Sequence, residues 1–185
     1  MALTPSTMLP LGTVAPDFTL PDTVTGQDMA LQALKSDMAT VIMFICNHCP
    51  YVKHVSDELA NLAKDYQAKG VSFIAISSND ITNRPEDSPE NMKQTAHDWG
   101  LSFPYLYDET QEVAKAYQAA CTPDFYIFDG ELRCVYRGQL DDSRPNTDIP
   151  VTGKDLRTAL DSVLSGEQVS SEQKPSMGCN IKWKS

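Results

Sequence analysis

Residues 41–49 read Val41-Ile42-Met43-Phe44-Ile45-Cys46-Asn47-His48-Cys49. The first five form a short apolar run, which is typical of a strand buried on both faces. The apolar residues after Cys49 recur every three or four positions, which predicts a helix. This segment therefore places two cysteines between a buried strand and a helix start. The N–H groups and the positive dipole end at a helix start stabilise a thiolate, so the arrangement indicates redox chemistry.

The composition is that of one globular domain. The chain has 185 residues, of which 41% are hydrophobic, enough for a full core. We expect a single domain over residues 1–185, with its core at about residues 12–166 and a C-terminal tail at residues 167–185.

Charge and hydropathy limit the possible partners. The formal net charge is -10, which argues against binding to nucleic acid or to anionic membrane surfaces, because both need a basic patch. Residues 1–12 lack the charged and apolar regions of a secretory signal, and no apolar run approaches the roughly 18 residues of a membrane helix. The sequence predicts a soluble cytoplasmic protein with no nucleic-acid or membrane partner.

The chain has five cysteines, too few for a disulfide scaffold of this size, and their odd number leaves at least one unpaired. In a reducing compartment a C-x-x-C pair then indicates redox chemistry or metal binding. For zinc, the expected second knuckle of cysteines or histidines is absent from the sequence. No cofactor or metal is predicted.

The apolar period changes repeatedly along the chain, which predicts alternating strands and helices. Strands are expected at residues 41–46, 71–77, 125–128 and 133–137, and Asp129-Gly130 between the last two is a hairpin signal. Helices are expected at residues 52–66, from Ser88-Pro89 to about Gly100, after a capping box formed by Asp108 and Gln111, and at residues 156–164. The predicted fold class is α/β, with a mixed central sheet flanked by helices on both faces.

The motifs resemble those of the thioredoxin superfamily, in particular its peroxiredoxin-like branch (AhpC/TSA type, redoxin) that carries C-x-x-C. The segments that carry the resemblance cover nearly the whole chain: Ala15-Pro16-Asp17-Phe18, residues 44–51, residues 78–80, residues 86–92, Thr122-Pro123-Asp124-Phe125 with the following Asp129-Gly130, and residues 178–183. The resemblance implies a thioredoxin-like fold with an N-terminal extension and a C-terminal tail. It further implies that the bond between Thr122 and Pro123 is cis and lies opposite the cysteine pair, where Thr122 offers its backbone to a substrate.

Two departures from the family patterns matter for the chemistry. Thioredoxins carry an acidic residue six positions before the first cysteine, and here that residue is Thr40. Peroxiredoxins usually show a threonine three positions before the reactive cysteine, together with a distant arginine. If Cys49 is the reactive cysteine, the threonine position holds Cys46. Asp124 lies about where the arginine is expected. Proton transfer to a buried thiol must therefore use another group or water.

The expected mechanism is attack by one thiolate on a disulfide, followed by resolution of the mixed disulfide by the second cysteine. By analogy with thioredoxin, Cys46 is the nucleophile and Cys49 resolves. However, Pro50 favours the first helical position and would make Cys49 the residue that caps the helix and lies nearest the dipole. The sequence leaves open which thiol is the better nucleophile.

Further residues are candidates for the site. His48 lies between the two cysteines, where its N–H or its charge would stabilise a thiolate, and it is predicted with Thr122 and Pro123 to contact substrate. Cys121 and Cys179 are additional redox candidates: the first precedes the Thr-Pro pair, and the second lies in a tail that is able to fold back. Cys134 falls in a predicted strand and is expected in the core.

Three functions are compatible with these residues. The first is a thiol-disulfide oxidoreductase that cycles a Cys46–Cys49 disulfide, with a protein or small-molecule disulfide as substrate, an external dithiol donor and a role in redox homeostasis. The second is a thiol peroxidase with antioxidant activity in which Cys49 reacts with peroxide. The third is a metal carrier that uses Cys46, Cys49 and His48 with Cys121 or Cys179.

Overall fold

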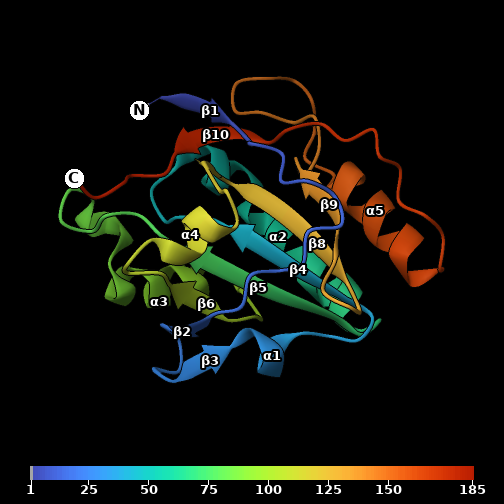
Figure 1. Cartoon of the computed structure of the whole chain (residues 1–185). Helices are drawn as coiled ribbons and strands as arrows, with labels where there is room; N and C mark the ends of the chain where they lie inside the picture. Colours follow the sequence, from blue (N-terminus) through green and yellow to red (C-terminus); the bar gives the residue numbers. More distant parts are fainter. Residues whose placement is uncertain (1) are drawn as a thin grey trace.

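The computed structural model describes residues 2–185, and its centre is a five-stranded mixed sheet (Figure 1). β4, β5 and β6 are parallel, whereas β8 pairs antiparallel with β4 and β9 antiparallel with β8. Across the sheet the strands are, in order, β6 (Tyr105–Tyr107), β5 (Val71–Ser77), β4 (Ala39–Phe44), β8 (Asp124–Asp129) and β9 (Cys134–Gly138). The predicted mixed sheet is confirmed, with β4 at its centre.

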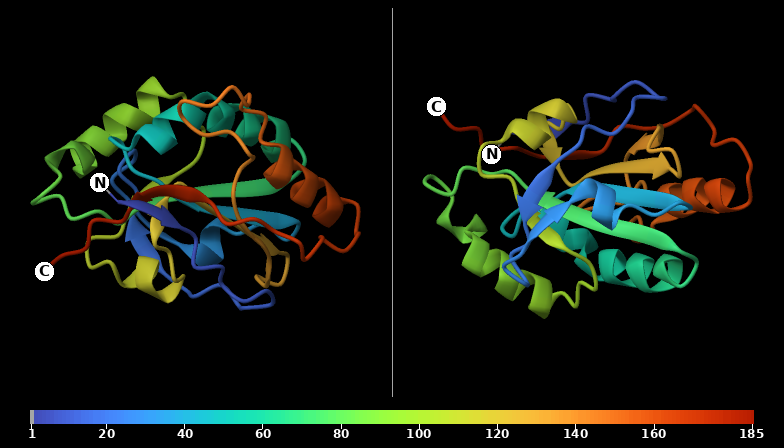
Figure 2. Two further views of the ribbon diagram at one scale, coloured as in Figure 1. Left: turned by 90° about the horizontal axis from the view of Figure 1, so that it is seen from above. Right: turned by 60° about the horizontal axis from the view of Figure 1, so that its bottom comes forward.

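Helices cover both faces of this sheet (Figure 2). Alternate residues of β4 enter different cores: Val41 and Met43 pack on one face, and Ile42 and Phe44 on the other, as expected for a strand whose side chains alternate. The first core is closed by α2 (Pro50–Gln67), α3 (Pro89–Asp98) and α5 (Lys154–Leu164), and the second by α1 (Leu31–Leu34) and α4 (Glu112–Ala116). The predicted layer arrangement is confirmed.

The longer helices begin where the sequence predicts. α2 starts at Pro50, and α3 starts at Pro89 after Ser88, whose hydroxyl oxygen accepts a hydrogen bond from the Asn91 N–H at 3.3 Å. Both prolines occupy the first helical position, where a missing N–H costs nothing. Among residues 2–185, none of the helices combines the length and the apolar character needed to cross a membrane.

The shorter elements differ from the prediction. The strand β6 was not predicted, because three residues are too short to show a period. The capping box is wrong in detail: Gln111, with φ 65, is the residue before α4, while the Asp108 carboxylate accepts from the N–H of Ala114 at 2.9 Å. Asp108 thus satisfies free N–H groups of α4 from outside the helix.

Two small sheets complete the fold. β2 (Thr19–Pro21) and β3 (Asp28–Ala30) form an antiparallel pair joined by a turn that contains Gly26. The other sheet has the order β1 (Leu3–Pro5), β10 (Met177–Asn180) and β7 (Cys121–Thr122), so the two terminal segments lie side by side (Figure 1). The C-terminal tail therefore folds back, as the sequence allows, and β10 reaches the edge of the molecule that carries the cysteine motif.

Candidate active site

The cysteine motif occupies the loop between β4 and α2. Cys49 has extended dihedrals, φ -70 and ψ 125, and is the residue that precedes the first turn of α2, with Pro50 in the first helical position. The helix therefore begins after Cys49, as the preference of Pro50 indicated, and Cys46 lies three residues earlier in the loop. Both side chains are buried, Cys46 at 1% and Cys49 at 0% exposure.

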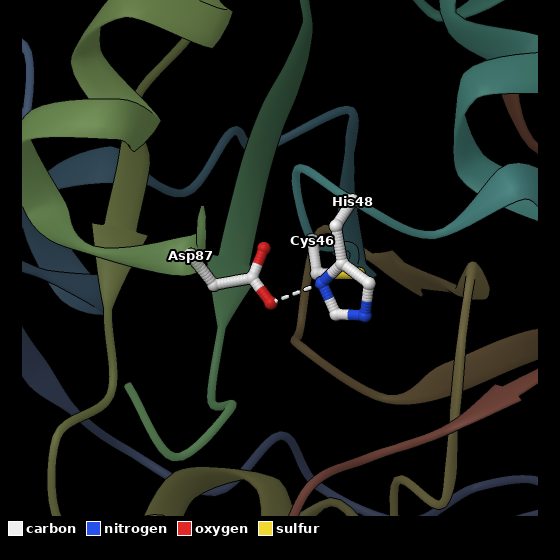
Figure 3. Close-up of side chains that lie close together, drawn as sticks. All are labelled: Cys46, His48 and Asp87. Carbon is white, nitrogen blue, oxygen red and sulfur yellow. Dashed lines mark hydrogen bonds and ion pairs between the residues drawn. The ribbon is translucent and has the colours of Figure 1, made fainter. Parts of the chain in front are cut away.

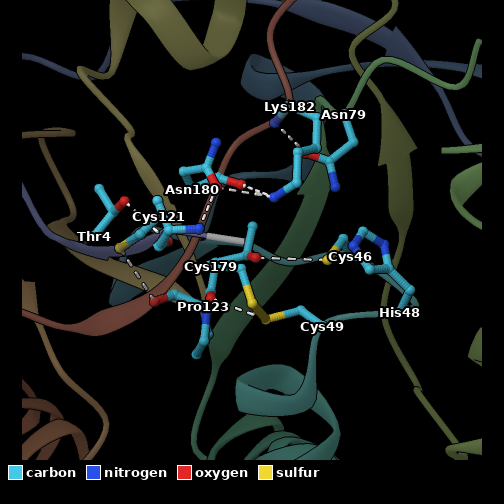
Figure 4. Close-up of a disulfide and its surroundings, with 12 residues drawn as sticks. Thr4, Cys46, His48, Cys49, Asn79, Cys121, Pro123, Cys179, Asn180 and Lys182 are labelled. Carbon is cyan, nitrogen blue, oxygen red and sulfur yellow. Dashed lines mark hydrogen bonds between the residues drawn. A yellow bond between two sulfur atoms is a disulfide. The ribbon is translucent and has the colours of Figure 1, made fainter. Parts of the chain in front are cut away.

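Cys49 forms a disulfide with Cys179 of β10, whereas Cys46 is a free thiol (Figure 4). The expected Cys46–Cys49 disulfide is thus not the pairing of this structure. The reason lies in the terminal sheet: β10 pairs antiparallel with β7 and sets Cys179 opposite Thr122, whose carbonyl oxygen is 3.5 Å from the Cys49 sulfur. The tail is thereby brought to Cys49 from a sequence separation of 130.

The peptide bond between Thr122 and Pro123 is cis and lies against both cysteines of the motif, as the family resemblance implied. The hydroxyl of Thr122 is 3.5 Å from the Cys46 sulfur. Thr122 therefore contacts both sulfur atoms, one through its side chain and the other through its backbone.

The tail occupies the backbone edge of Thr122. Gly178 packs so closely that a Cβ atom there would lie 1.9 Å from the Thr122 carbonyl oxygen. The next pair along the register, Asn180 opposite Cys121, extends this contact. In this state the backbone of Thr122 is paired with the chain's own β10, and an extended substrate has no access to it.

Cys46 has a charged neighbourhood on its other side (Figure 3). The His48 Nδ1 atom lies 2.5 Å from Asp87 Oδ2, with 14% of the His48 side chain and 0% of the Asp87 side chain exposed. Ligand-type atoms of Cys46, His48 and Asp87 all lie within 4.8 Å of one another. The structure therefore assembles a thiol, an imidazole and a carboxylate at one point.

These contacts shift the pKa values of His48 and Asp87. Hydrogen bonds to Asp87 and Cys46 outweigh burial and raise the pKa of His48 to about 9. Burial acts to raise the pKa of Asp87, but hydrogen bonds from His48, Asn79 and the backbone of Asn47 hold it below its usual value. At neutral pH the pair is an imidazolium and a carboxylate, and an imidazolium beside a sulfur atom favours the thiolate form.

Asp87 belongs to the short 3₁₀ helix η1 (Pro85–Asp87), which follows β5. Its carboxylate also accepts from the Asn47 N–H at 2.8 Å and from the Asn79 side-chain amide at 2.9 Å. The Asn79 side-chain oxygen in turn accepts from the Lys182 N–H of the tail at 2.8 Å. One hydrogen-bond network therefore joins the cysteine loop, η1 and the C-terminal tail.

His48 keeps one ring atom available. Its Nε2 atom is buried and has no hydrogen-bond partner within residues 2–185. His48 also lines an open hollow of about 350 Å³ whose walls are mainly polar: Asn47, His48, Lys53, Glu86, Asn91, Gln94 and Thr95. His48 therefore connects the sulfur site to this hollow, while its Nε2 atom itself is buried.

Cys121, a predicted redox candidate, lies on β7 with its sulfur 3.8 Å from the Pro123 carbonyl oxygen, and burial raises its thiol pKa well above the usual range. It is a free thiol, and the charge of Asp124 adds to the increase of its pKa while that of Arg144 opposes it. Cys134 is 2% exposed on β9, and burial raises its pKa to about 11. The expectation that Cys134 lies in the core is confirmed.

The two departures from the family patterns have structural explanations. The hydroxyl of Thr40, at the position of the thioredoxin acid, accepts from the Ser36 N–H at 2.9 Å and is fully buried. Asp124, near the position of the peroxiredoxin arginine, bonds to Ser6 at 2.8 Å, and burial raises its pKa to about 7. The titratable side chains beside Cys46 are instead those of His48 and Asp87.

The ligand set of the third function considered from the sequence, a metal carrier, is not assembled, because Cys49 and Cys179 are joined to each other. The cluster of Cys46, His48 and Asp87 does combine donor types that zinc accepts. However, the ion pair between His48 and Asp87 already explains this cluster.

No motif in the sequence indicates a role for Asp87. The only signal is its position, since it follows a parallel strand whose carboxyl end lies at the same sheet edge as the cysteine motif. Seven residues separate Asp87 from Asn79, so its contact with His48 depends on how the connecting loop folds.

Fold and site together define a thiol-based redox enzyme of the thioredoxin superfamily. A crystal structure of a putative thiol:disulfide interchange protein DsbE from Chlorobium tepidum shares the fold, with a TM-score of 0.67 and 16% identity over 84% of this chain and 99% of that chain. The AhpC/TSA family model matches residues 11–137, more than half of the sequence. The chain belongs to the AhpC/TSA family.

Two further relatives are informative. A crystal structure of an uncharacterized conserved protein from Geobacillus kaustophilus is 65% identical, with a TM-score of 0.98 over 100% of this chain and 97% of that chain. Thiol-disulfide oxidoreductase ResA of Geobacillus thermodenitrificans is 24% identical over 162 residues, which cover 86% of this chain and 82% of that protein.

Proposed function

We propose that this protein is a thiol-disulfide oxidoreductase in which Cys46 is the attacking thiolate. The observation that carries the proposal is the position of a free Cys46 within 4.8 Å of the ion pair formed by the partly buried His48 and the buried Asp87. Cys49, in contrast, is near the helix dipole but is already joined to Cys179. The similarity to a ResA protein supports the same class of reaction.

In the forward reaction, the Cys46 thiolate attacks one sulfur of a substrate disulfide, and the other substrate sulfur leaves as a thiolate. The His48 imidazolium gives its proton to this leaving group, and Asp87 keeps the imidazole charged and oriented until then. Cys49, after losing its proton to water, then attacks the Cys46 sulfur of the mixed disulfide as a thiolate. The bond between Cys46 and the substrate sulfur breaks, this second substrate sulfur leaves as a thiolate that takes a proton from water, and a Cys46–Cys49 disulfide remains. An external dithiol reduces the enzyme for the next cycle.

The substrate is a small disulfide or an exposed protein disulfide that enters at the hollow beside His48. Thr122 and Pro123 form the opposite wall of the sulfur site, with the Thr122 hydroxyl in contact with Cys46. An external dithiol then reduces the Cys46–Cys49 disulfide and completes the cycle. The buried polar atom of His48 that faces no protein partner supports its role in substrate contact.

The test is turnover of a protein disulfide, such as insulin, with a dithiol donor. We expect wild-type protein to accelerate the reduction and Cys46→Ser to abolish the acceleration. Cys134→Ser is the matched control, because Cys134 is also a buried free thiol but lies on β9. Equal rates for wild-type protein and Cys46→Ser would exclude Cys46 as nucleophile.

A peroxidase activity is the second candidate, supported by the family and by the disulfide in the structure. A peroxide that oxidises Cys49 to a sulfenic acid would allow the Cys179 thiol to condense with it, forming the observed disulfide and water. Rapid consumption of hydrogen peroxide that survives Cys46→Ser but not Cys49→Ser would establish this activity, and with it an antioxidant role.

We place the protein in the cytoplasm, where it would act in redox homeostasis. The three free buried cysteines support a reducing surrounding. Fractionation of cells that express the chain, with a compartment marker in each fraction, tests this placement, and recovery outside the cytoplasmic fraction would contradict it.

A further inference from the structure

Cys179 is one partner of the disulfide that the structure contains, yet the two-cysteine cycle above does not use it. We propose that Cys179 is a third redox cysteine that takes the disulfide over from Cys46. This relay rests on the proposed function, since it acts on the Cys46–Cys49 disulfide that the first reaction leaves. Its product is the Cys49–Cys179 disulfide with a free Cys46.

The geometry supports a transfer at Cys49. Cys49 is the one sulfur common to both disulfides, and its position is fixed by the start of α2. Thr122 contacts the Cys46 sulfur through its hydroxyl and the Cys49 sulfur through its carbonyl oxygen, both at 3.5 Å. The same residue is paired with Cys179 in the terminal sheet. All three cysteines of the relay therefore contact Thr122 or pair with it.

The exchange balances without an outside oxidant. The Cys179 thiol gives its proton to water, and the resulting thiolate attacks the Cys49 sulfur of the Cys46–Cys49 disulfide. The bond between Cys46 and Cys49 breaks, the bond between Cys49 and Cys179 forms, and Cys46 leaves with the electron pair as a thiolate. One disulfide and one thiol are present before and after the step.

The charges in the site favour this direction. Cys46 leaves as a thiolate next to an imidazolium that Asp87 holds in place, and a stabilised thiolate is a good leaving group. Asn79 connects Asp87 to the Lys182 backbone, three residues after Cys179. The same hydrogen bonds thus orient the carboxylate that stabilises the leaving group and dock the segment that carries the attacking sulfur.

The relay has a consequence for the enzyme. It regenerates Cys46 as a thiolate. The oxidising equivalent is then stored as the Cys49–Cys179 disulfide, between the start of α2 and β10. In that state β10 covers the backbone edge of Thr122 and all three sulfur atoms are buried, with exposures of 0 to 1%. The structure described here is this oxidised, closed state.

The experiment uses full-length reduced protein and one equivalent of the coloured disulfide 5,5′-dithiobis(2-nitrobenzoate), with acid quenching at successive times. Trypsin cleaves after Lys35, Lys53, Arg157 and Lys182, so the two disulfides differ in mass spectra. The Cys46–Cys49 bond lies within peptide 36–53, whereas the Cys49–Cys179 bond joins peptide 36–53 to peptide 158–182.

We expect the bond within peptide 36–53 to form first and to decay at the rate at which the cross-linked pair of peptides appears. Cys179→Ser should stop at the first product. Asp87→Asn should shift the final ratio toward the first product by roughly tenfold, the value of one charge-assisted hydrogen bond. Asp98→Asn is the control, because Asp98 pairs with His97 on the surface, where 58% and 85% of the side chains are exposed.

Two results separate the relay from the proposed function. A wild-type protein that releases the coloured thiolate but keeps the Cys46–Cys49 bond would overturn the relay alone. So would a cross-link that forms without a lag and equally fast in Cys46→Ser. A wild-type protein that does not react with the reagent would overturn both the oxidoreductase function and the relay. Because Asp87→Asn keeps every cysteine, its time course stays informative even if Cys179→Ser fails to fold.

Discussion

Cys46 and Cys121 are two free thiols in the neighbourhood of the same cis peptide bond, and burial does not distinguish them. Their exposures are 1% and 0%, and each sulfur contacts an oxygen of the Thr122-Pro123 pair. Their electrostatic surroundings differ. Cys46 lies within 4.8 Å of an imidazole and a carboxylate, whereas burial raises the pKa of Cys121 and the nearby Asp124 charge adds to the increase.

The contrast shows what converts a buried cysteine into a nucleophile. Burial alone favours the neutral thiol, because a thiolate loses its hydration. A positive charge that is itself buried and paired reverses this preference locally. In this protein one histidine and one aspartate, which come from different elements of the fold, form the charged pair beside Cys46. Substitutions at these residues should either increase the difference in reactivity between Cys46 and Cys121 or remove it.

The largest effect is expected from removing each sulfur in turn. Cys46→Ser should lower the rate of disulfide reduction on the order of a thousandfold, as loss of a covalent nucleophile does, because a serine hydroxyl does not form the mixed disulfide. Cys121→Ser should retain a rate of the wild-type order. Turnover of insulin with a dithiol donor measures both. A similar loss in the two variants would remove the distinction between them.

The next effect concerns the charge that activates Cys46. Asp87→Asn removes the carboxylate that raises the pKa of His48 to about 9, so the imidazole becomes neutral at a lower pH. We expect the rate at neutral pH to fall roughly 10- to 100-fold. In the wild type we expect the rate to fall at alkaline pH, near pH 9. In Asp87→Asn the pH at which the rate falls should move toward the ordinary pKa of a histidine. The pH-rate profile is the measurement.

Asp98→Asn serves as the matched control for this variant, since it changes a second aspartate beside a histidine, with a His97–Asp98 distance of 3.5 Å on the surface. Its profile should coincide with that of the wild type. An unchanged profile in Asp87→Asn as well would mean that Asp87 has a structural role only.

Stability should depend on pH through the same pair. The pKa of His48 is raised from 6.5 to about 9 on folding, so its contribution is complete below pH 6.5 and is lost as pH rises through 9. We expect the free energy of unfolding to fall by about 1 to 3 kcal/mol over this range. Urea unfolding of the Cys49–Cys179 form from pH 6 to pH 10 measures it.

His48→Asn should remove this alkaline loss, and His97→Asn should not, because 85% of the His97 side chain is exposed. The pKa of Asp87 is lowered, so its contribution has the opposite sign: it is present above the usual aspartate value and is lost as pH falls into the acid range. An identical alkaline slope in wild-type protein and His48→Asn would assign the effect to other groups.

The sequence predicts the parts of this site that depend on local order. The start of α2 at Pro50 follows from the restriction that a proline imposes on its neighbours, and the strand before it from an unbroken apolar run. These are interactions between residues close in the chain. They place Cys46 and Cys49 correctly without any knowledge of the remainder of the fold.

The partners of the two cysteines depend on long-range contacts, which local patterns do not encode. Asp87 is 39 positions from His48, and Cys179 is 130 positions from Cys49. The sequence shows that the tail is able to fold back. Which residue of the tail then meets Cys49 depends on the register of β10 against β7. This register is set by the packed sheet. The sequence therefore predicts the motif and leaves its chemistry dependent on the tertiary structure.

The smallest effect should come from Cys121→Ala. This change removes a buried sulfur from β7 and leaves a small cavity, so we expect the free energy of unfolding to fall by about 1 kcal/mol. The rate of disulfide reduction should stay within roughly twofold of the wild type. Cys134→Ala, which removes the other buried sulfur outside the motif, is the matched control for the loss of packing. A folded Cys121→Ala variant with a rate tenfold lower than Cys134→Ala would show that Cys121 takes part in the reaction, because the two changes remove the same atom from equally buried positions.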